Sequence, residues 1–135
     1  MRDMKNNIKD LVALAPVAIT SNTTTVGLII DLQGFNSATM QFMTGVLTDG
    51  DYVFLLQEGD DASLSDASAV ADADLIGTEA DMSFTDDTDD AQTAILGYIG
   101  TKRYIRASII STGTTTGALV SVACLLGNAS ICPVA

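Results

Sequence analysis

The segment Arg103-Tyr104-Ile105-Arg106-Ala107-Ser108-Ile109-Ile110 decides the fold class. Successive side chains of an extended strand point to opposite faces. The segment therefore places Tyr104, Arg106, Ser108 and Ile110 on one face and Arg103, Ile105, Ala107 and Ile109 on the other. Turn-forming residues, Gly100-Thr101-Lys102 before it and Gly113-Thr114-Thr115-Thr116-Gly117 after it, bound the alternation. This pattern predicts a strand between two turns.

Similar strands are predicted along most of the chain, at residues 26–32, 38–46, 52–57, 94–99 and 118–126, with a short strand around 75–76. Within 38–46, the alternation places Met40, Phe42 and Thr44 on one face. Thr48-Asp49-Gly50-Asp51 is typical of a hairpin, because Asp-Gly supplies a positive φ. Since the connections are short, we expect an antiparallel meander. The fold class is therefore all-β, a single-domain antiparallel β-sandwich or jelly roll.

The N-terminal residues differ in character from the strands that follow. Residues 1–16 combine basic side chains with apolar ones, and one or two helical turns are expected within residues 4–14. We therefore divide the chain into an N-terminal arm, residues 1–16, and a sandwich domain, residues 17–135, which includes an acidic loop region at 58–92. No targeting or membrane segment is expected, because residues 11–19 form too short an apolar run and Pro16 interrupts it.

The composition excludes several classes of function. The 135 residues carry 6 Lys and Arg against 17 Asp and Glu, a net charge of −11, and there is no His. A chain this acidic would be repelled by phosphate backbones, so we expect no nucleic-acid partner. The absence of His removes catalysis by Ser-His-Asp or Cys-His groups and zinc sites that use His ligands. The hydrophobic fraction of 47% is too high for a disordered acidic chain.

Charge is distributed unevenly along the sequence. All six cations lie in two short segments, and residues 11–101 contain none, whereas fourteen acidic residues fall between Asp49 and Asp90. The cations near the start are Arg2, Lys5 and Lys9, and the later ones are Lys102, Arg103 and Arg106. The later cations either pair with the protein's own acidic loops or contact an acidic partner or a neighbouring subunit.

The carboxylates are the main candidates for catalysis or metal binding, but no pattern among them matches a known catalytic or calcium site. A glycosidase needs two carboxylates in a cleft lined by aromatic residues, but this chain has no Trp. The runs Asp86-Asp87-Thr88-Asp89-Asp90 and Asp72-Ala73-Asp74 offer oxygen ligands for calcium, yet the EF-hand spacing is absent. We expect no enzyme activity, no metal and no cofactor, and we interpret these runs as solvated loops.

The two cysteines leave two interpretations open. Cys124 falls within a predicted strand, where a small apolar side chain fits, and Cys132 lies close to the end of the chain. A disulfide between them is the alternative.

Four segments together resemble a known family. They are the arm Leu11-Val12-Ala13-Leu14-Ala15-Pro16 with Ser21-Asn22-Thr23; Asp31-Leu32-Gln33-Gly34-Phe35-Asn36-Ser37-Ala38; Leu55-Leu56-Gln57-Glu58-Gly59-Asp60-Asp61 with the 70–77 segment; and Leu96-Gly97-Tyr98-Ile99-Gly100-Thr101-Lys102-Arg103-Tyr104-Ile105-Arg106. Over nearly the whole chain they look like the head decoration, or cement, proteins of tailed bacteriophages, which are encoded beside the major capsid protein.

The resemblance implies a structural protein on the outer capsid surface of the virion, made in the cytoplasm of the bacterial host. Its partners would be the major capsid protein and further copies of itself, with a trimer favoured and a dimer open. It implies neither enzyme activity nor a cofactor, and neither a nucleic acid nor a membrane is expected as a partner. We predict that the capsid or subunit contacts involve Arg2, Met4, Lys5, Ile8, Lys9, Leu11, Leu14, Lys102, Arg103 and Arg106.

Two other functions remain as alternatives. A tail or head–tail connector component would also be β-rich and oligomeric. A carbohydrate- or calcium-binding module like those of adhesins is the third hypothesis, against which the scarcity of aromatic residues argues.

Overall fold

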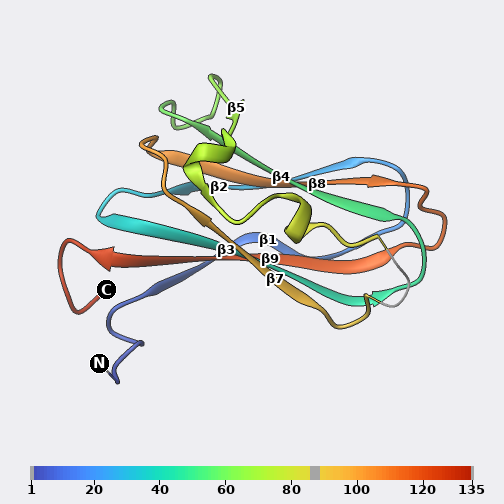
Figure 1. Ribbon diagram of the computed structural model, residues 1–135, viewed down its shortest axis with the longest axis horizontal. Helices are drawn as coiled ribbons and strands as arrows, with labels where there is room; N and C mark the ends of the chain where they lie inside the picture. Colours follow the sequence, from blue (N-terminus) through green and yellow to red (C-terminus); the bar gives the residue numbers. More distant parts are fainter. Residues whose placement is uncertain (1, 86–88, 135) are drawn as a thin grey trace.

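The computed structural model describes residues 2–85 and 89–134 and places two antiparallel sheets face to face (Figure 1). The first sheet, sheet A, has the strand order β1-β9-β3-β7-β6, and the second, sheet B, has the order β2-β8-β4-β5. Two short 3₁₀ helices, η1 (Asp72–Asp74) and η2 (Ala80–Met82), lie in the connection between β5 and β7. The strands are β1 (Lys9–Ile19), β2 (Thr24–Asp31), β3 (Phe35–Leu47), β4 (Asp51–Gly59), β5 (Ser68–Ala69), β6 (Leu75–Ile76), β7 (Thr93–Tyr98), β8 (Tyr104–Thr112) and β9 (Ala118–Ala129).

The strands pair in a nested order that identifies a jelly roll. β1 pairs with β9, β2 with β8, and β3 with β7, as in one long hairpin. Wrapping that hairpin brings β3 beside β9 and β4 beside β8 and so forms two sheets. This is the double-sheet arrangement of a jelly roll, and the predicted all-β sandwich class is confirmed.

The expected meander of neighbouring strands is wrong. The turn at residues 48–51 joins β3 of sheet A to β4 of sheet B, and the 113–117 turn likewise joins β8 to β9 across the sandwich. Each of these strands has one apolar face, which must be buried against a second layer. Crossing between sheets lets the apolar faces of β3 and β4 meet, and the Phe42 and Phe54 ring centroids lie 6.2 Å apart.

The core lies between the sheets and follows the predicted alternation. Met40, Phe42 and Thr44 of β3 all point inward and are buried. In β8 the inward set is Ile105, Ala107 and Ile109, each fully buried. The expected strand at 75–76 is present as β6.

The N-terminal strand differs from the expected arm. No helical turn is found within residues 4–14 apart from a hydrogen-bonded turn at residues 5–7, and β1 runs through the boundary expected at residue 16. Ala13 and Leu14 are buried in the core, and Leu11 packs against it. The folded domain therefore begins at Lys9, and only residues 2–8, here named the terminal turn, precede the first strand.

A close approach of β1 to β2 requires glycine at position 27. A Cβ on Gly27 would lie 2.3 Å from the carbonyl oxygen of Ala13 and 2.6 Å from that of Ala107. Both obstacles are backbone atoms, so neither can move without shifting a strand. The missing side chain thus lets the edge strands of the two sheets come together.

The turns at one end of the sandwich are joined by a single carboxylate. Asp49, between β3 and β4, accepts hydrogen bonds from the backbone N–H groups of Thr115, Thr116 and Gly117 and from the Thr115 hydroxyl. These donors hold the pKa of Asp49 far below its ordinary value, the Thr115 hydroxyl contributing most. The charge of Asp49 therefore fastens the β3–β4 turn to the β8–β9 turn.

Residues 60–92 are here named the acidic connection. Those that the structure describes, 60–85 and 89–92, pack against the sandwich, and several of their carboxylates accept hydrogen bonds from backbone N–H groups of local turns or of neighbouring strands. The apolar side chains Val70, Leu75, Met82 and Phe84 of the connection are buried. Asp66 accepts hydrogen bonds from the backbone of Asp60 and Asp61, a capping role in a tight loop. The connection is thus more than the solvated loop expected from its composition. Asp86, Asp87 and Thr88 lie outside the described residues.

Candidate functional site

The cations at the start of β8 form ion pairs within the chain. The Lys102 ammonium lies 2.7 Å from a carboxylate oxygen of Asp60. The Arg103 guanidinium donates two hydrogen bonds of 2.9 Å to the carboxylate of Asp31, and a third to Gln33. These pairs raise the pKa of Lys102 and of Arg103, and the Arg103 guanidinium lowers the pKa of Asp31. Both cations are about 45% exposed, with side-chain values of 43% and 46%.

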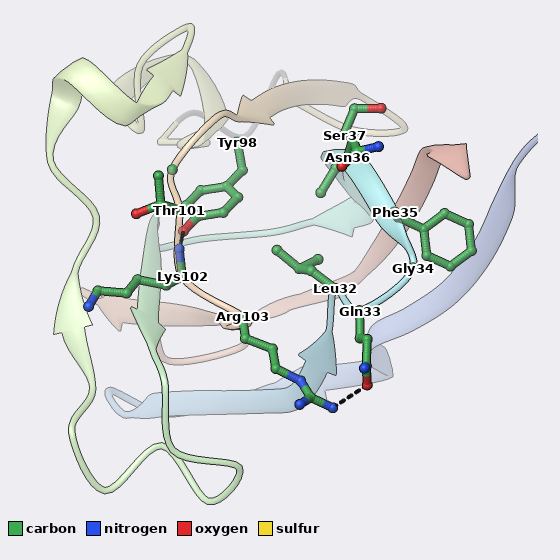
Figure 2. A pocket seen from close by; sticks show the side chains of 12 residues that line it. Leu32, Gln33, Gly34, Phe35, Asn36, Ser37, Tyr98, Thr101, Lys102 and Arg103 are labelled. Atoms are coloured by element: carbon green, nitrogen blue, oxygen red, sulfur yellow. Dashed lines mark hydrogen bonds between the residues drawn. The ribbon is translucent and has the colours of Figure 1, made fainter. Parts of the chain in front are cut away.

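Lys102 and Arg103 line a hollow of about 380 Å³ at the end of the sandwich where the chain termini lie (Figures 1 and 2). Its two walls are the 32–38 segment, which joins β2 to β3, and the 100–103 turn before β8. Figure 2 shows Arg103 reaching Gln33 across the mouth of the hollow. Because its two cations are already neutralised by partners within the chain, the hollow has little free positive charge for a ligand.

Tyr98 forms part of the hollow's wall and connects it to β4. Its hydroxyl donates a 2.5 Å hydrogen bond to Glu58 and accepts one of 3.1 Å from the backbone N–H of Lys102. Burial, and then the hydrogen bond to the Glu58 carboxylate, raise the pKa of Tyr98 well above its usual range. The phenol is therefore protonated at any physiological pH and serves as a structural crosslink.

Arg106 lies on the outer face of sheet B and has a neutral partner. Its guanidinium donates hydrogen bonds of 2.9 and 3.3 Å to the side-chain carbonyl of Gln57 on the neighbouring strand. No carboxylate forms an ion pair with Arg106 in residues 2–85 or 89–134. The three later cations are thus separated: two at the hollow, and one on the sheet.

Three exposed cations lie in the terminal turn and at the first residue of β1. Arg2, Lys5 and Lys9 are exposed, and none forms a salt bridge among the residues that the structure describes. Met4 is 67% exposed, and Ile8 is half-buried. Two cations and an exposed thioether side chain are therefore presented together ahead of β1.

The terminal turn is held together by hydrogen bonds within the chain. The Asp3 carboxylate accepts hydrogen bonds from the backbone and side chain of Asn6, and the Met4 carbonyl accepts from the backbone of Asn7 and Ile8. A 2.8 Å hydrogen bond from the Val134 backbone N–H to the Asn6 carbonyl ties the turn to the C-terminal tail. Residues Met4 and Ile8 lie next to the 127–129 end of β9 and Cys132, around a second hollow.

The predicted contact residues thus fall into two structural classes. Arg2, Met4, Lys5 and Lys9 are exposed at or beside the terminal turn, whereas Leu11 and Leu14 pack on or within the core. Leu14 is buried and Leu11 is half-buried, so both side chains contribute to the stability of the domain, and their contact with a partner stays a prediction. Whether the exposed residues contact a capsid or another subunit stays a prediction.

The groups considered for catalysis or metal binding are dispersed. Within residues 2–85 and 89–134, no three Cys, Asp or Glu side chains come together in a way that could hold a metal ion. Both cysteines are free: Cys124 is buried in β9, where burial raises its pKa to about 12, and Cys132 is exposed. No helix of the described residues is long and apolar enough to span a membrane.

Sequence reasoning missed the outer face of sheet A. The segments 35–47, 93–98 and 118–129, which form β3, β7 and β9, contain no charged residue. The absence of charge in these segments was visible in the sequence. The sequence did not show that they form one continuous surface, because only the pairing of the strands places all three side by side.

A scan against known protein families and a search of curated proteins give no match. Among solved structures, the SPBc2 prophage-derived protein YomS is similar over 89% of this chain and 92% of its own, with 16% identity and a TM-score of 0.40. An infectious bursal disease virus structure, Gx strain, is similar over 93% of this chain, with 12% identity and a TM-score of 0.43. The VP2 subviral particle of the same virus is similar over 93% of this chain, with 13% identity and a TM-score of 0.33.

This chain spans 33% and 41% of the two bursal virus chains. At such low identities and TM-scores, the likenesses carry no argument about function.

Proposed function

We propose that this protein is a structural virion protein that binds the outer surface of an assembled phage capsid and stabilises contacts between major capsid protein subunits. In this proposal it acts without catalysis or a cofactor, as an oligomer, after synthesis in the cytoplasm of the bacterial host. The resemblance of its sequence to the decoration proteins of tailed phages first suggested this role, and the jelly-roll topology is compatible with it.

One observation carries the proposal: the exposed terminal turn, in which Arg2 and Lys5, which form no salt bridge among the described residues, lie beside the exposed Met4. In a chain of net charge −11, unpaired cations gathered at one end favour a contact with an acidic surface. Burial of the exposed apolar side chain of Met4 in such a contact would add a favourable hydrophobic contribution. Lys102 and Arg103 support the proposal less, because Asp60 and Asp31 already hold them.

A cement protein of this kind acts through mass action. A protein that binds the assembled shell but not its free subunits stabilises the shell by the free energy of binding. The carboxylates of the acidic connection would then face solvent and keep decorated particles from aggregating.

The test removes the proposed anchor and leaves the domain intact. Deleting residues 2–8 should abolish binding to capsids that lack the protein, measured by co-sedimentation with purified particles. Cooperative unfolding should persist, because β1 begins at Lys9. Lys102→Ala is the comparison variant: Asp60 already pairs with this cation, so its removal should weaken binding much less than the deletion does. Full occupancy by the deletion variant would refute the anchor.

Copy number separates this function from that of a connector component. A lattice protein should be present in on the order of hundreds of copies per particle, whereas a connector forms a single ring with far fewer. Quantitative gel or mass-spectrometric stoichiometry of purified virions gives that number.

A further inference from the structure

The outer face of sheet A has an unusual composition for a surface in water. The strands β9, β3 and β7 carry no charge, and β1 adds only Lys9 and Asp10 at its start. A solvent-facing side of an antiparallel sheet is normally polar. Here the outward positions include Met43, Ile95 and Leu119, which are 38%, 65% and 51% exposed. We call this surface the uncharged face.

The centre of the uncharged face includes several small side chains. Ser121 and Ala123 of β9 point outward there, next to Met43 and Gln41 of β3 in the register of the sheet. Gly97 of β7 lies opposite Thr39. Small side chains at the centre allow another sheet to approach to about 10 Å, the usual separation of stacked sheets.

The rim of the face carries an exposed leucine beside two hollows. Leu119 projects between two shallow hollows of about 180 and 220 Å³. One hollow is bordered by Ala18 and Val46, and the other by Pro16 and Met43. In a two-fold arrangement, the leucine of each copy can enter a hollow of the other, because in such an interface one patch meets itself.

The available area matches that of a stable dimer. The strands β1, β9, β3 and β7 contain 11, 12, 13 and 6 residues. At about 3.4 Å along a strand and 4.8 Å between strands, they cover roughly 700 Å². A standard interface buries about 800 Å² on each partner.

The distribution of charge also favours a second copy of this chain as the partner of the uncharged face. Two copies of net charge −11 repel each other, and the repulsion is weakest where the contacting surfaces hold no carboxylates. Eleven of the seventeen acidic residues lie in the acidic connection and none in β9, β3 or β7. A second copy therefore fits the uncharged face better than any surface that includes the connection.

We infer that two copies of this chain associate through the uncharged face, sheet against sheet, in a two-fold dimer. The inference deepens the oligomer included in the proposed function and specifies a dimer where the sequence favoured a trimer.

The test is sedimentation equilibrium of the full chain at micromolar concentrations, with Ala123→Lys as the decisive variant. A lysine at this central outward position would bring like charges together across the two-fold axis. We expect the unmodified protein to be a dimer and the variant to dimerise at least tenfold more weakly. Gln41→Lys, at a neighbouring outward position, should weaken dimerisation by a similar factor. This variant replaces Ala123→Lys in the test if Ala123→Lys fails to fold.

Val53→Lys is the matched control. It adds the same charge on the outer face of sheet B, at a side chain that is 41% exposed, and should leave the dimer intact. A monomeric or trimeric wild type would overturn the inference, and so would equal weakening by Val53→Lys. Because sedimentation of the purified protein involves no capsid, failure here is distinct from a failure of capsid binding.

Discussion

Sheet A and the acidic connection both bury apolar side chains, but they differ in the charge of the residues that stay exposed. In sheet A, β9, β3 and β7 bury one face and leave the other free of charge. The connection also buries apolar residues, such as Met82 and Phe84, but places carboxylates wherever the chain turns. The difference teaches that most of the acidic residues of this protein lie in the connections between its strands. The proposed contact surfaces and most of the negative charge are therefore located on different elements.

The largest expected effect comes from separating the two regions. Phe84 of the acidic connection packs edge-on against Phe42 of β3, with ring centroids 4.9 Å apart. Phe84→Ala should lower the free energy of unfolding by about 3–5 kcal/mol, because it leaves a cavity between the connection and the sheet. Urea denaturation measures it. Val53→Ala, which removes an exposed side chain next to Phe54 on the outer face of sheet B, should cost about 0.5 kcal/mol or less. Equal effects would mean that the connection is not part of the core.

The second largest effect is expected at Glu79, whose carboxylate holds the acidic connection to β4. Glu79 accepts a 2.7 Å hydrogen bond from the backbone N–H of Leu56 in β4. Glu79→Ala leaves that partly buried donor unsatisfied and should cost about 1–3 kcal/mol. Glu79→Gln keeps an acceptor oxygen and should recover most of the loss in the same unfolding assay. No recovery would show that the charge of Glu79, rather than the hydrogen bond, matters.

A smaller effect, dependent on pH, is expected at the turn between β3 and β4. The folded protein holds the pKa of Asp49 below the ordinary value of 3.8, so the carboxylate stabilises the fold fully above that pH. The contribution is lost as the pH falls through the depressed pKa. Asp49→Asn should therefore be less stable than the wild type at pH 7, and the difference should shrink below about pH 4.

Thermal unfolding followed by circular dichroism between pH 7 and pH 2 gives the two stability profiles for Asp49→Asn and the wild type. A difference that stays constant over this range would mean that ionisation of Asp49 contributes nothing. Asp51→Asn, in the same turn, is the matched control.

The smallest effect belongs to the exposed ion pair at the hollow. Lys102→Ala removes the contact with Asp60, and both side chains are largely exposed, so solvent and salt screen their attraction. We expect an unfolding midpoint within experimental scatter of the wild type at 150 mM salt. A clear loss of stability would show that the pair organises the end of the sandwich.

The sequence was sufficient for most of the strands, though not for β1 or β5, and alternation showed which residues of β3 and β8 face inward. Alternation assigned Met40 and Phe42 of β3 to one face, and both are buried. It could not predict which strands pair. Asp49-Gly50 indicated a tight turn correctly, but the same turn serves a hairpin or a crossing between sheets. The choice depends on burying two apolar faces against each other, which is a property of the whole chain.

The candidate site was predictable only in part for a similar reason. The cations were visible in the sequence, but the pairing of Arg103 with Asp31 joins residues 72 positions apart. Likewise, Leu11 and Leu14 were grouped with the exposed residues of the arm, and register with β9 places them against the core. Pairing over such distances depends on topology, which local patterns do not contain.

The sequence by itself determined the class of fold, the inward residues of the alternating segments 38–46 and 103–110, and the separation of charge along the chain, because side-chain alternation and composition are local properties. Only the tertiary structure decided that β9, β3 and β7 lie side by side, that the acidic connection joins the core, and that the terminal turn presents unpaired cations. The physical reason is that burial and pairing are satisfied by the chain as a whole, and an uncharged segment becomes an uncharged face only when folding places it beside others.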